Sequence, residues 1–230
     1  MENLSCTSVD CLVVGAGPAG LAATLYLRRF HRQVMLADSG LSRAMRIDRS
    51  HNMPGFPEGI SGKALLVRLR KQVAEAKGAV TRAEVSALAR DGENGFTAIV
   101  GGRPVSARQV VLATGVVDRE PPLPGLPSVR RRGLLRHCPV CDGYEHSGQR
   151  ILVLGDGAHA RAEARFLSHY SRHVTLVGVE APATNAEPAE RPSTAVLNSM
   201  VQRVGLRPEG GLAVQLQDGT RHPFDVMYMA

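Results

Sequence analysis

Short apolar runs that lead into glycine-rich turns organise this chain, and two of them share one layout. Residues 9–14 form a nearly continuous apolar run, Gly15–Gly20 follows, and apolar residues then continue at helical spacing through Leu27. Residues 151–154 run in the same way into the segment 155–160, ahead of a helix to about residue 170 and a strand at 174–177. Each stretch predicts a strand, a tight turn and a helix.

The rest of the pattern predicts further elements. Residues 63–77 have a helical apolar face, and the alternating segments 85–89, 96–100 and 104–105 predict a small antiparallel meander. Residues 109–113 predict a buried strand that returns to the parallel sheet. Apolar residues repeat at helical spacing ahead of Gly205, so we expect a helix there that contains Val196, Leu197, Met200, Val201 and Val204. Residues 181–192 indicate a flexible loop, and 212–216 with 224–229 a closing hairpin.

Prolines at 121, 122, 124 and 127 mark a stiff connector between two domains. The boundary predicted from it gives domains at 1–117 and 118–230, and each is long enough to bury a core of its own.

Composition and charge exclude several classes of protein. With 43% hydrophobic residues and four cysteines, the chain is unlike a secreted disulfide scaffold. Neither a signal peptide nor an apolar run that could span a bilayer is visible, so we expect a cytoplasmic protein with no membrane partner. The net charge is +7, but the basic residues are mostly dispersed and aromatic residues are few, so we expect no nucleic-acid partner. The densest basic cluster, Arg130–Arg132 with Arg136, is interpreted as a solvated loop or as a docking patch for an acidic protein.

The first glycine turn favours an adenine dinucleotide. Glycines permit a tight turn and close approach of the backbone to a pyrophosphate, and the helix that follows offers free N–H groups. Asp38 ends the next strand, where a ribose hydroxyl is bound in such folds. The candidate cofactor-binding residues in the first domain are Gly15, Gly17, Pro18, Ala19, Gly20 and Asp38, together with Ala113, Thr114 and Gly115 at the end of a later strand.

The segment Cys138-Pro139-Val140-Cys141-Asp142 carries the predicted chemistry. Two cysteines at this spacing can close a small disulfide ring, and in a reducing compartment such a pair is usually catalytic or metal-binding. A carboxylate directly after the second cysteine is well placed to protonate a leaving thiolate. Cys11 lies within the first strand and is expected to be a small buried residue, and Cys6 a tail residue.

Together these motifs resemble the low-molecular-weight thioredoxin reductase family and its thioredoxin-reductase-like relatives, within the pyridine nucleotide-disulfide oxidoreductases. The resemblance covers essentially the whole chain and includes Asn52-Met53-Pro54-Gly55 and the second turn with Gly155, Gly157 and Ala160. It implies an α/β fold of two Rossmann-like FAD/NAD(P)-binding domains, each a three-layer β-β-α arrangement with parallel sheets and small antiparallel meanders. FAD would bind the first domain, with Asn52 among its ligands, and NADPH or NADH the second, at Gly155, Gly157 and Ala160.

In function, the resemblance implies a flavoprotein in which electrons pass from a nicotinamide cofactor through FAD to the dithiol. A thioredoxin-like protein or a small disulfide or dithiol would be the substrate, and the protein would be a homodimer. Cys138 would attack the substrate disulfide, Cys141 would lie against the flavin, and Asp142 would carry the proton.

Three departures from the family pattern qualify this reading. The basic run that holds the 2′-phosphate of NADPH is replaced by Gly178-Val179-Glu180, which favours NADH or no nicotinamide. Leu41-Ser42-Arg43-Ala44 resembles the reductase-like branch more than typical reductases. The sequence stops at Ala230, so we expect the last FAD-domain segment of the family to be missing, FAD binding to be weakened and apolar surface to be uncovered.

Other functions stay open on the residues alone. Cys138, Cys141, His137 and His146 could form a zinc site, although we expect no metal because no second cysteine pair accompanies them. A redox sensor whose disulfide controls partner binding is a second alternative. A flavin thiol oxidase, or a reductase with a donor other than nicotinamide, is a third.

Overall fold

Two compact units make up the chain, Met1–Val117 and Asp118–Ala230. The structure, a computed structural model, describes residues 7–92, 95–181, 183 and 194–230. The predicted roles of Cys6 and of most of the 181–192 loop lie outside the described residues. Within the described part, no helix is both long and apolar enough to cross a membrane.

The first unit contains a six-stranded sheet in the order β3-β2-β1-β6-β5-β4. β1, β2, β3 and β6 run parallel, and β4 and β5 extend the sheet in antiparallel fashion. The elements are β1 (Thr7–Val14), α1 (Pro18–Arg29), β2 (Val34–Asp38), η1 (Arg43–Arg46), α2 (Gly62–Glu75), β3 (Val80–Arg82), β4 (Val85–Asp91), β5 (Gly95–Val100) and β6 (Arg103–Leu112).

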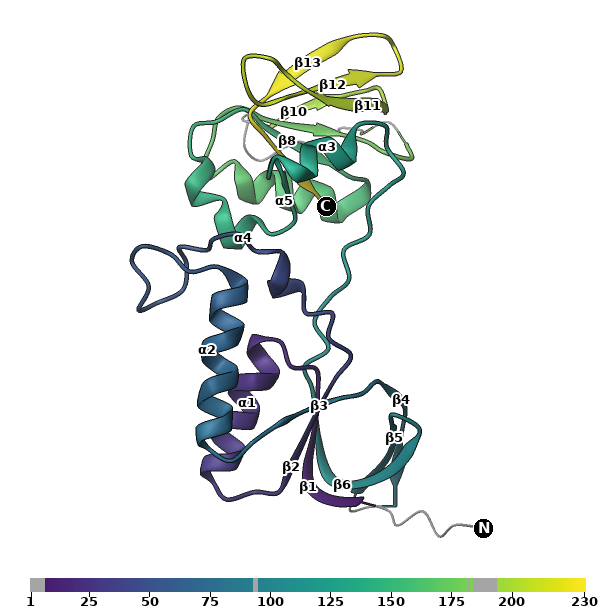
Figure 1. Cartoon of the computed structure of the whole chain (residues 1–230). Helices are drawn as coiled ribbons and strands as arrows, with labels where there is room; N and C mark the ends of the chain where they lie inside the picture. Colours follow the sequence, from purple (N-terminus) through teal and green to yellow (C-terminus); the bar gives the residue numbers. More distant parts are fainter. Residues whose placement is uncertain (1–6, 93–94, 182, 184–193) are drawn as a thin grey trace. The chain divides into compact units, whose positions relative to one another are not determined.

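Side chains of the central strand β1 alternate between the two faces of the sheet, and both faces are covered by other elements. Cys11 and Val13 pack against the apolar sides of α1 and α2, which lie together on one side of the strands in Figure 1. Leu12 points to the opposite face, where it packs with Ala98 of β5, Val105 of β6 and their neighbours. Cys11 is a buried free cysteine, as predicted.

The second unit contains a five-stranded parallel sheet in the order β10-β9-β8-β14-β7 and a three-stranded antiparallel sheet, β11-β12-β13. Its elements are α3 (Leu126–Arg131), β7 (Leu135–Arg136), α4 (Pro139–Asp142), η2 (Tyr144–His146), β8 (Ile151–Leu154), α5 (Gly157–Leu167), β9 (Val174–Val177), β10 (Thr194–Leu197), β11 (Val201–Leu206), β12 (Leu212–Leu216), β13 (Arg221–Phe224) and β14 (Val226–Met229).

Three layers form this unit. Val226 and Tyr228 of β14 share one apolar cluster with the buried face of α5. Met227 and Met229 point the other way, into a cluster with α3 and the three-stranded sheet. The parallel sheet is therefore buried on both faces, which explains why β8 and β14 are apolar throughout. The predicted α/β class with parallel sheets and antiparallel additions is confirmed.

Several predicted elements differ from the structure. The helix expected through Val196 and Val204 is wrong, because these residues belong to the strands β10 and β11. The predicted closing hairpin is wrong in its second half: β12 pairs with β13, while β14 joins the parallel sheet. Residues 104–105 and 109–113 are not separate strands, since a continuous β6 pairs with β5 and with β1. The arginines 130 and 131 end the helix α3 and do not lie in a loop.

Candidate redox-active site

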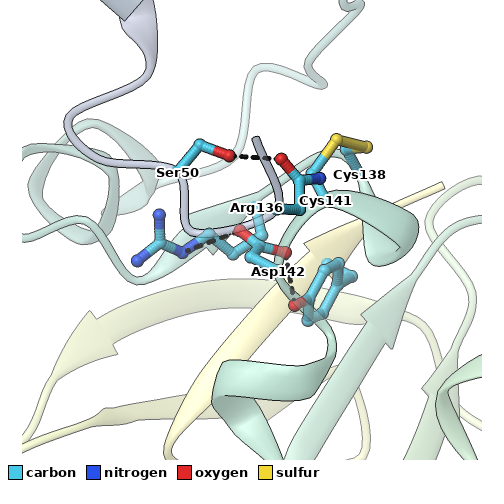
Figure 2. Close-up of a disulfide and its surroundings, with 7 residues drawn as sticks. Ser50, Arg136, Cys138, Cys141 and Asp142 are labelled. Atoms are coloured by element: carbon cyan, nitrogen blue, oxygen red, sulfur yellow. Dashed lines mark hydrogen bonds and ion pairs between the residues drawn. A yellow bond between two sulfur atoms is a disulfide. The ribbon is translucent and has the colours of Figure 1, made fainter. Parts of the chain in front are cut away.

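Cys138 and Cys141 form a disulfide at the start of the short helix α4 (Figure 2). Their Cα atoms are 5.2 Å apart, because the Cys141 N–H donates to the carbonyl of Cys138 and folds the chain into one turn. Pro139 occupies the first position of this turn, where its fixed φ suits a helix and its missing N–H costs no bond. The cysteine spacing thus produces the pair that the sequence predicted.

Gly143 ends this turn in a space that has no room for a side chain. A Cβ atom here would lie 2.6 Å from the carbonyl oxygen of Pro139 and 2.9 Å from the ring of Tyr170. The Gly143 N–H also donates to that same carbonyl over 2.8 Å. The glycine after Asp142 is therefore required by close packing around the turn.

Asp142 is held by two neighbours. The hydroxyl of Tyr228 donates to its Oδ1 over 2.7 Å, and Nε of Arg136 lies 3.6 Å from its Oδ2 (Figure 2). The side chain keeps a quarter of its surface exposed, so the carboxylate is supported on both oxygens and still reaches solvent. The residue predicted to carry the proton therefore has defined partners.

The arginine cluster is partly engaged within its own unit. Glu120 forms an ion pair with Arg130, and its Oε1 lies 3.4 Å from Nε2 of His137, the residue before Cys138. Arg131 donates to the hydroxyl of Ser128. Arg132 is exposed as well, and its side chain has no such bond among the described residues. A docking patch made of all three arginines is therefore a weaker interpretation.

In the first unit, the predicted residues of the glycine turn gather at the carboxyl edge of the sheet. A Cβ at Gly15 would collide with the carbonyl of Ala113, and one at Gly20 with the carbonyl of Gly15, so both glycines are needed for close packing. Gly15 also has φ of 100°, which favours glycine. Gly17, by contrast, has space beside it, with only the Ser42 hydroxyl 3.5 Å from an added Cβ.

Asp38, which is predicted to bind a ribose hydroxyl, also takes part in this turn. It is buried, and its Oδ1 accepts the N–H of Ala16 over 3.0 Å. Asp38 therefore fixes the turn itself with one oxygen.

Three other predicted cofactor residues lie at more open positions. Thr114 and Gly115 follow β6 and are exposed, and Gly115 has open space around its Cα. Asn52 lies in the loop between η1 and α2, where its Oδ1 accepts the hydroxyl of Ser50 over 2.5 Å.

The second glycine turn contains an internal carboxylate. Gly155 and Ala160 pack against each other, and Gly157 begins α5 with φ of 71°. Asp156, between the glycines, accepts the N–H groups of Val179 (3.0 Å), Glu180 (3.1 Å) and Ala181 (3.4 Å). The loop that follows β9 is therefore tied to the turn by a negatively charged side chain.

The zinc alternative has no support in the described residues. Cys138 and Cys141 bond to each other, and Nδ1 of His146 lies 2.9 Å from the amide oxygen of Gln149. Nowhere in the described ranges do three or more cysteine, histidine or acidic side chains gather as they would around a metal ion.

Sequence reasoning missed Tyr228, Arg136 and Asp156 as parts of these sites. Tyr228 and Asp142 are 86 residues apart, and no spacing motif connects them. The available signal was weak: Tyr228 is the one residue with a hydroxyl in an otherwise apolar strand. A buried hydroxyl must find a hydrogen-bond partner.

Two units that each contain a strand, a glycine turn and a helix, one of them with a disulfide beside a carboxylate, point to a class of disulfide oxidoreductases. The family described as pyridine nucleotide-disulphide oxidoreductase matches residues 9–229, and the chain belongs to this family.

Individual relatives give more detail. Thioredoxin reductase of Mycolicibacterium smegmatis is 33% identical over 177 residues, which are 76% of this chain and 56% of the relative. Thioredoxin reductase of Streptomyces coelicolor is 31% identical over 171 residues, 73% of this chain and 53% of the relative. The chain thus spans about half the length of the curated relatives it matches.

Solved structures share the fold. The crystal structure of HlmI is 31% identical with a TM-score of 0.79, over 96% of this chain and 71% of that one. Thioredoxin reductase from Streptococcus pyogenes has a TM-score of 0.82 at 23% identity, over 98% and 77% of the two chains, and supports the fold alone.

Proposed function

We propose that this chain is a flavin-dependent disulfide oxidoreductase similar to thioredoxin reductase. Electrons would pass from a nicotinamide cofactor through FAD to Cys138–Cys141, and from this dithiol to a protein or small-molecule disulfide. The observation that carries the proposal is the Cys138–Cys141 disulfide with Asp142 directly after it, supported on both carboxylate oxygens.

The residues of the first turn fit FAD, which when bound supplies two-electron chemistry. No side chain caps α1, so the N–H groups of its first turn are available to a phosphate. Gly17 has open space where a side chain would stand, while Gly15 and Gly20 hold the turn close to β6. Gly15, Gly17, Pro18, Ala19 and Gly20 would hold the pyrophosphate, and Thr114, Gly115 and Asn52 would line the same cofactor.

The chemistry assigned to the dithiol follows from its residues. Cys138 would attack a substrate disulfide as the thiolate, and Cys141 would close the ring and release the second substrate sulfur. Asp142 would give a proton to the leaving sulfur. The partner would be a thioredoxin-like protein or a small disulfide, and the protein would be a cytoplasmic homodimer.

The second turn fits NADPH poorly. Residues 178–181, which directly follow β9, include no lysine or arginine for a 2′-phosphate, and the Asp156 carboxylate occupies N–H groups of Val179, Glu180 and Ala181. A negative charge at this place repels a phosphate. This observation favours NADH over NADPH, and it also supports a second candidate function, in which the electrons come from another donor or a flavin thiol oxidase passes electrons from a dithiol to oxygen.

An anaerobic absorbance titration tests both candidates. Flavin bands that bleach with NADH or NADPH support the reductase and identify the donor. Flavin bands that persist with both, together with oxygen consumption in the presence of a dithiol, support the oxidase. A purified chain that binds no flavin, even after incubation with FAD, contradicts both.

A further inference from the structure

Strand β14 buries a hydroxyl in an apolar environment. The Tyr228 side chain shares an apolar cluster with Val226, Ile151 and Ala164 and has no solvent exposure. A buried hydroxyl without a partner destabilises a fold, and the Tyr228 hydroxyl finds its partner in Oδ1 of Asp142. A phenylalanine would fill the same space without needing a partner, so packing alone does not explain the tyrosine.

The direction of this hydrogen bond is fixed by the phenol. Burial, followed by the Asp142 carboxylate, raises the pKa of Tyr228 far above its usual range, so the phenol keeps its proton. It therefore donates and Asp142 accepts. The other charged or titratable groups that face the phenol are Arg136 and Glu145, and the ring of His146 lies edge-on at 6.1 Å.

Asp142 consequently has a different neighbour on each oxygen. Oδ1 accepts the Tyr228 O–H, and Oδ2 lies 3.6 Å from Nε of Arg136, which has no hydrogen-bond partner among the described residues. Without the Tyr228 hydroxyl, Oδ1 loses this donor and the carboxylate is held less firmly in one orientation.

We infer that Tyr228 is a positioning residue for disulfide exchange, because its hydroxyl holds the Asp142 carboxylate in the orientation from which it exchanges a proton with a cysteine sulfur. The inference rests on the proposed role of Asp142 in the function above. Arg136 assists from the opposite oxygen. Tyr228 itself transfers no proton.

Exchange with dithiothreitol isolates this step, because it needs neither flavin nor a nicotinamide. One dithiothreitol thiolate attacks a sulfur of the Cys138–Cys141 bond, that bond breaks, and a mixed disulfide forms while the other cysteine leaves and takes a proton. The second dithiothreitol thiol then displaces the remaining cysteine and closes a cyclic disulfide. Two electrons pass from dithiothreitol to the protein disulfide.

The experiment compares exchange rates of the full-length wild type, Tyr228→Phe, Tyr170→Phe and Asp142→Asn across pH. Tyr170 is the matched control, since its ring also packs at α4 and no bond to its hydroxyl is found among the described residues. Ratios to the wild-type rate cancel the effect of dithiothreitol ionisation.

We expect Asp142→Asn to be about 100-fold slower and Tyr228→Phe about 10-fold slower at neutral pH.

A double variant distinguishes a role exerted through Asp142 from a general loss of structure. If Tyr228 acts through Asp142, adding Tyr228→Phe to Asp142→Asn slows exchange no further. An equal slowing in both backgrounds, or equal rates in Tyr228→Phe and Tyr170→Phe, overturns the inference. An unchanged rate in Asp142→Asn overturns it as well, by removing the proton role on which it rests.

A second measurement remains available if Tyr228→Phe does not fold. Incorporation of 3-fluorotyrosine keeps the ring and makes the phenol a stronger donor, so the exchange rate changes with the label in the wild type and does not change in Asp142→Asn. An equal effect of the label in both proteins, or none in either, contradicts the inference. Flavin bleaching plays no part in these assays, so a failed flavin titration and a failed positioning role are distinguishable.

Discussion

At the scale of single residues, the two cysteines of α4 differ sharply from Cys11. Cys138 and Cys141 are paired and partly exposed, whereas burial raises the pKa of the Cys11 thiol and keeps it protonated and unreactive. We expect Cys138→Ser and Cys141→Ser each to lower disulfide turnover at least about 100-fold, because a serine oxygen cannot form the exchangeable bond. Cys11→Ala is the control and should retain turnover. A Cys138→Ser protein with wild-type turnover would show that the dithiol is not the reactive group.

Gly143 gives a second residue-scale prediction. An alanine there would press its Cβ against the Pro139 carbonyl and the Tyr170 ring, and a backbone atom cannot move aside easily. We expect Gly143→Ala to destabilise the protein by about 1–3 kcal/mol, measured as a lower midpoint of thermal unfolding. Gly205→Ala is the matched control, since a Cβ at Gly205 meets no atom within 4 Å. Equal effects of the two changes would contradict the steric argument.

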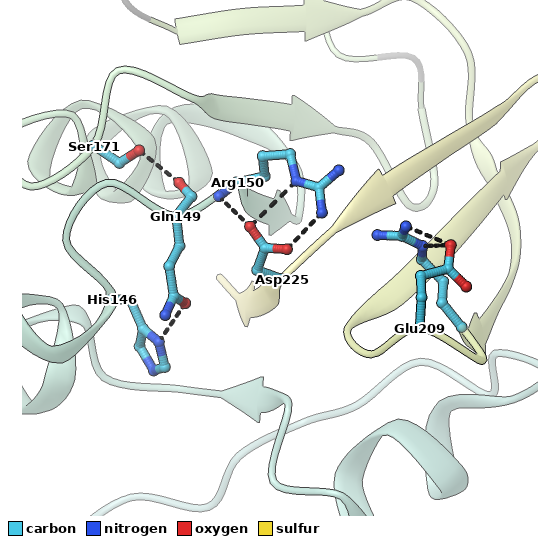
Figure 3. A network of polar contacts seen from close by, with 7 residues as sticks. His146, Gln149, Arg150, Ser171, Glu209 and Asp225 are labelled. Atoms are coloured by element: carbon cyan, nitrogen blue, oxygen red, sulfur yellow. Dashed lines mark hydrogen bonds and ion pairs between the residues drawn. The ribbon is translucent and has the colours of Figure 1, made fainter.

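At the scale of elements, the ion pair of Arg150 and Asp225 fixes the register of β14 against β8 (Figure 3). The Asp225 carboxylate accepts the Arg150 backbone N–H at 2.8 Å and the guanidinium at 2.6 and 3.2 Å, and the Asp225 N–H donates to the Arg150 carbonyl. These residues directly precede the pair Ile151 and Val226. A slip by one residue would turn Tyr228 to the opposite face of the sheet, away from Asp142.

The pH dependence of this pair can be measured. Its hydrogen bond to Arg150 holds the pKa of Asp225 below the usual range, so its contribution to stability is present at neutral pH and is lost as pH falls below about 4 through the folded-state value. We expect Asp225→Asn to lower the unfolding midpoint by a few degrees at pH 7 and to converge with wild type only as the pH falls well below 4. Glu75→Gln is the control, because Glu75 is exposed and the structure gives its side chain no ion pair or hydrogen bond among the described residues. A constant difference across pH would contradict this account.

The segment from Val196 to Val204 shows where sequence patterns are ambiguous. Its apolar residues fit helical spacing, but β10 pairs with β9 and β11 with β12, and Asn198 to Met200 form the break between them. Three of its strand residues, Val196, Val201 and Val204, are β-branched, and β-branched residues favour strands. Pairing with distant strands decided the outcome, and periodicity alone does not contain that information.

At the scale of the whole molecule, local motifs were predicted well and distant pairings were not. The glycine turns and the cysteine pair each lie within a few neighbouring residues, so their local sequence determines them. The Tyr228 to Asp142 bond and the Asp156 contacts with Val179 and Glu180 require strands to meet first. Such contacts follow from the sheet order, which the local pattern does not specify.

The division into two units gives a prediction at this scale. The disulfide, its carboxylate with both neighbours, and two apolar clusters all lie within Asp118–Ala230. We expect a fragment of residues 118–230 to unfold in one cooperative transition by circular dichroism and to retain the Cys138–Cys141 disulfide by thiol counting. Thermal unfolding without a cooperative transition would show that this part of the chain depends on the rest for its fold.

Tyr228 also gives the molecule an optical reporter. The chain has four tyrosines and no tryptophan, so the near-ultraviolet difference spectrum between wild type and Tyr228→Phe belongs to a single phenol. Because burial raises the pKa of Tyr228, its contribution to stability is complete below the unfolded-state value near pH 10 and declines above it. The tyrosinate signal of this residue at alkaline pH should therefore appear together with unfolding, so a spectrophotometer can follow the integrity of the redox site without any substrate.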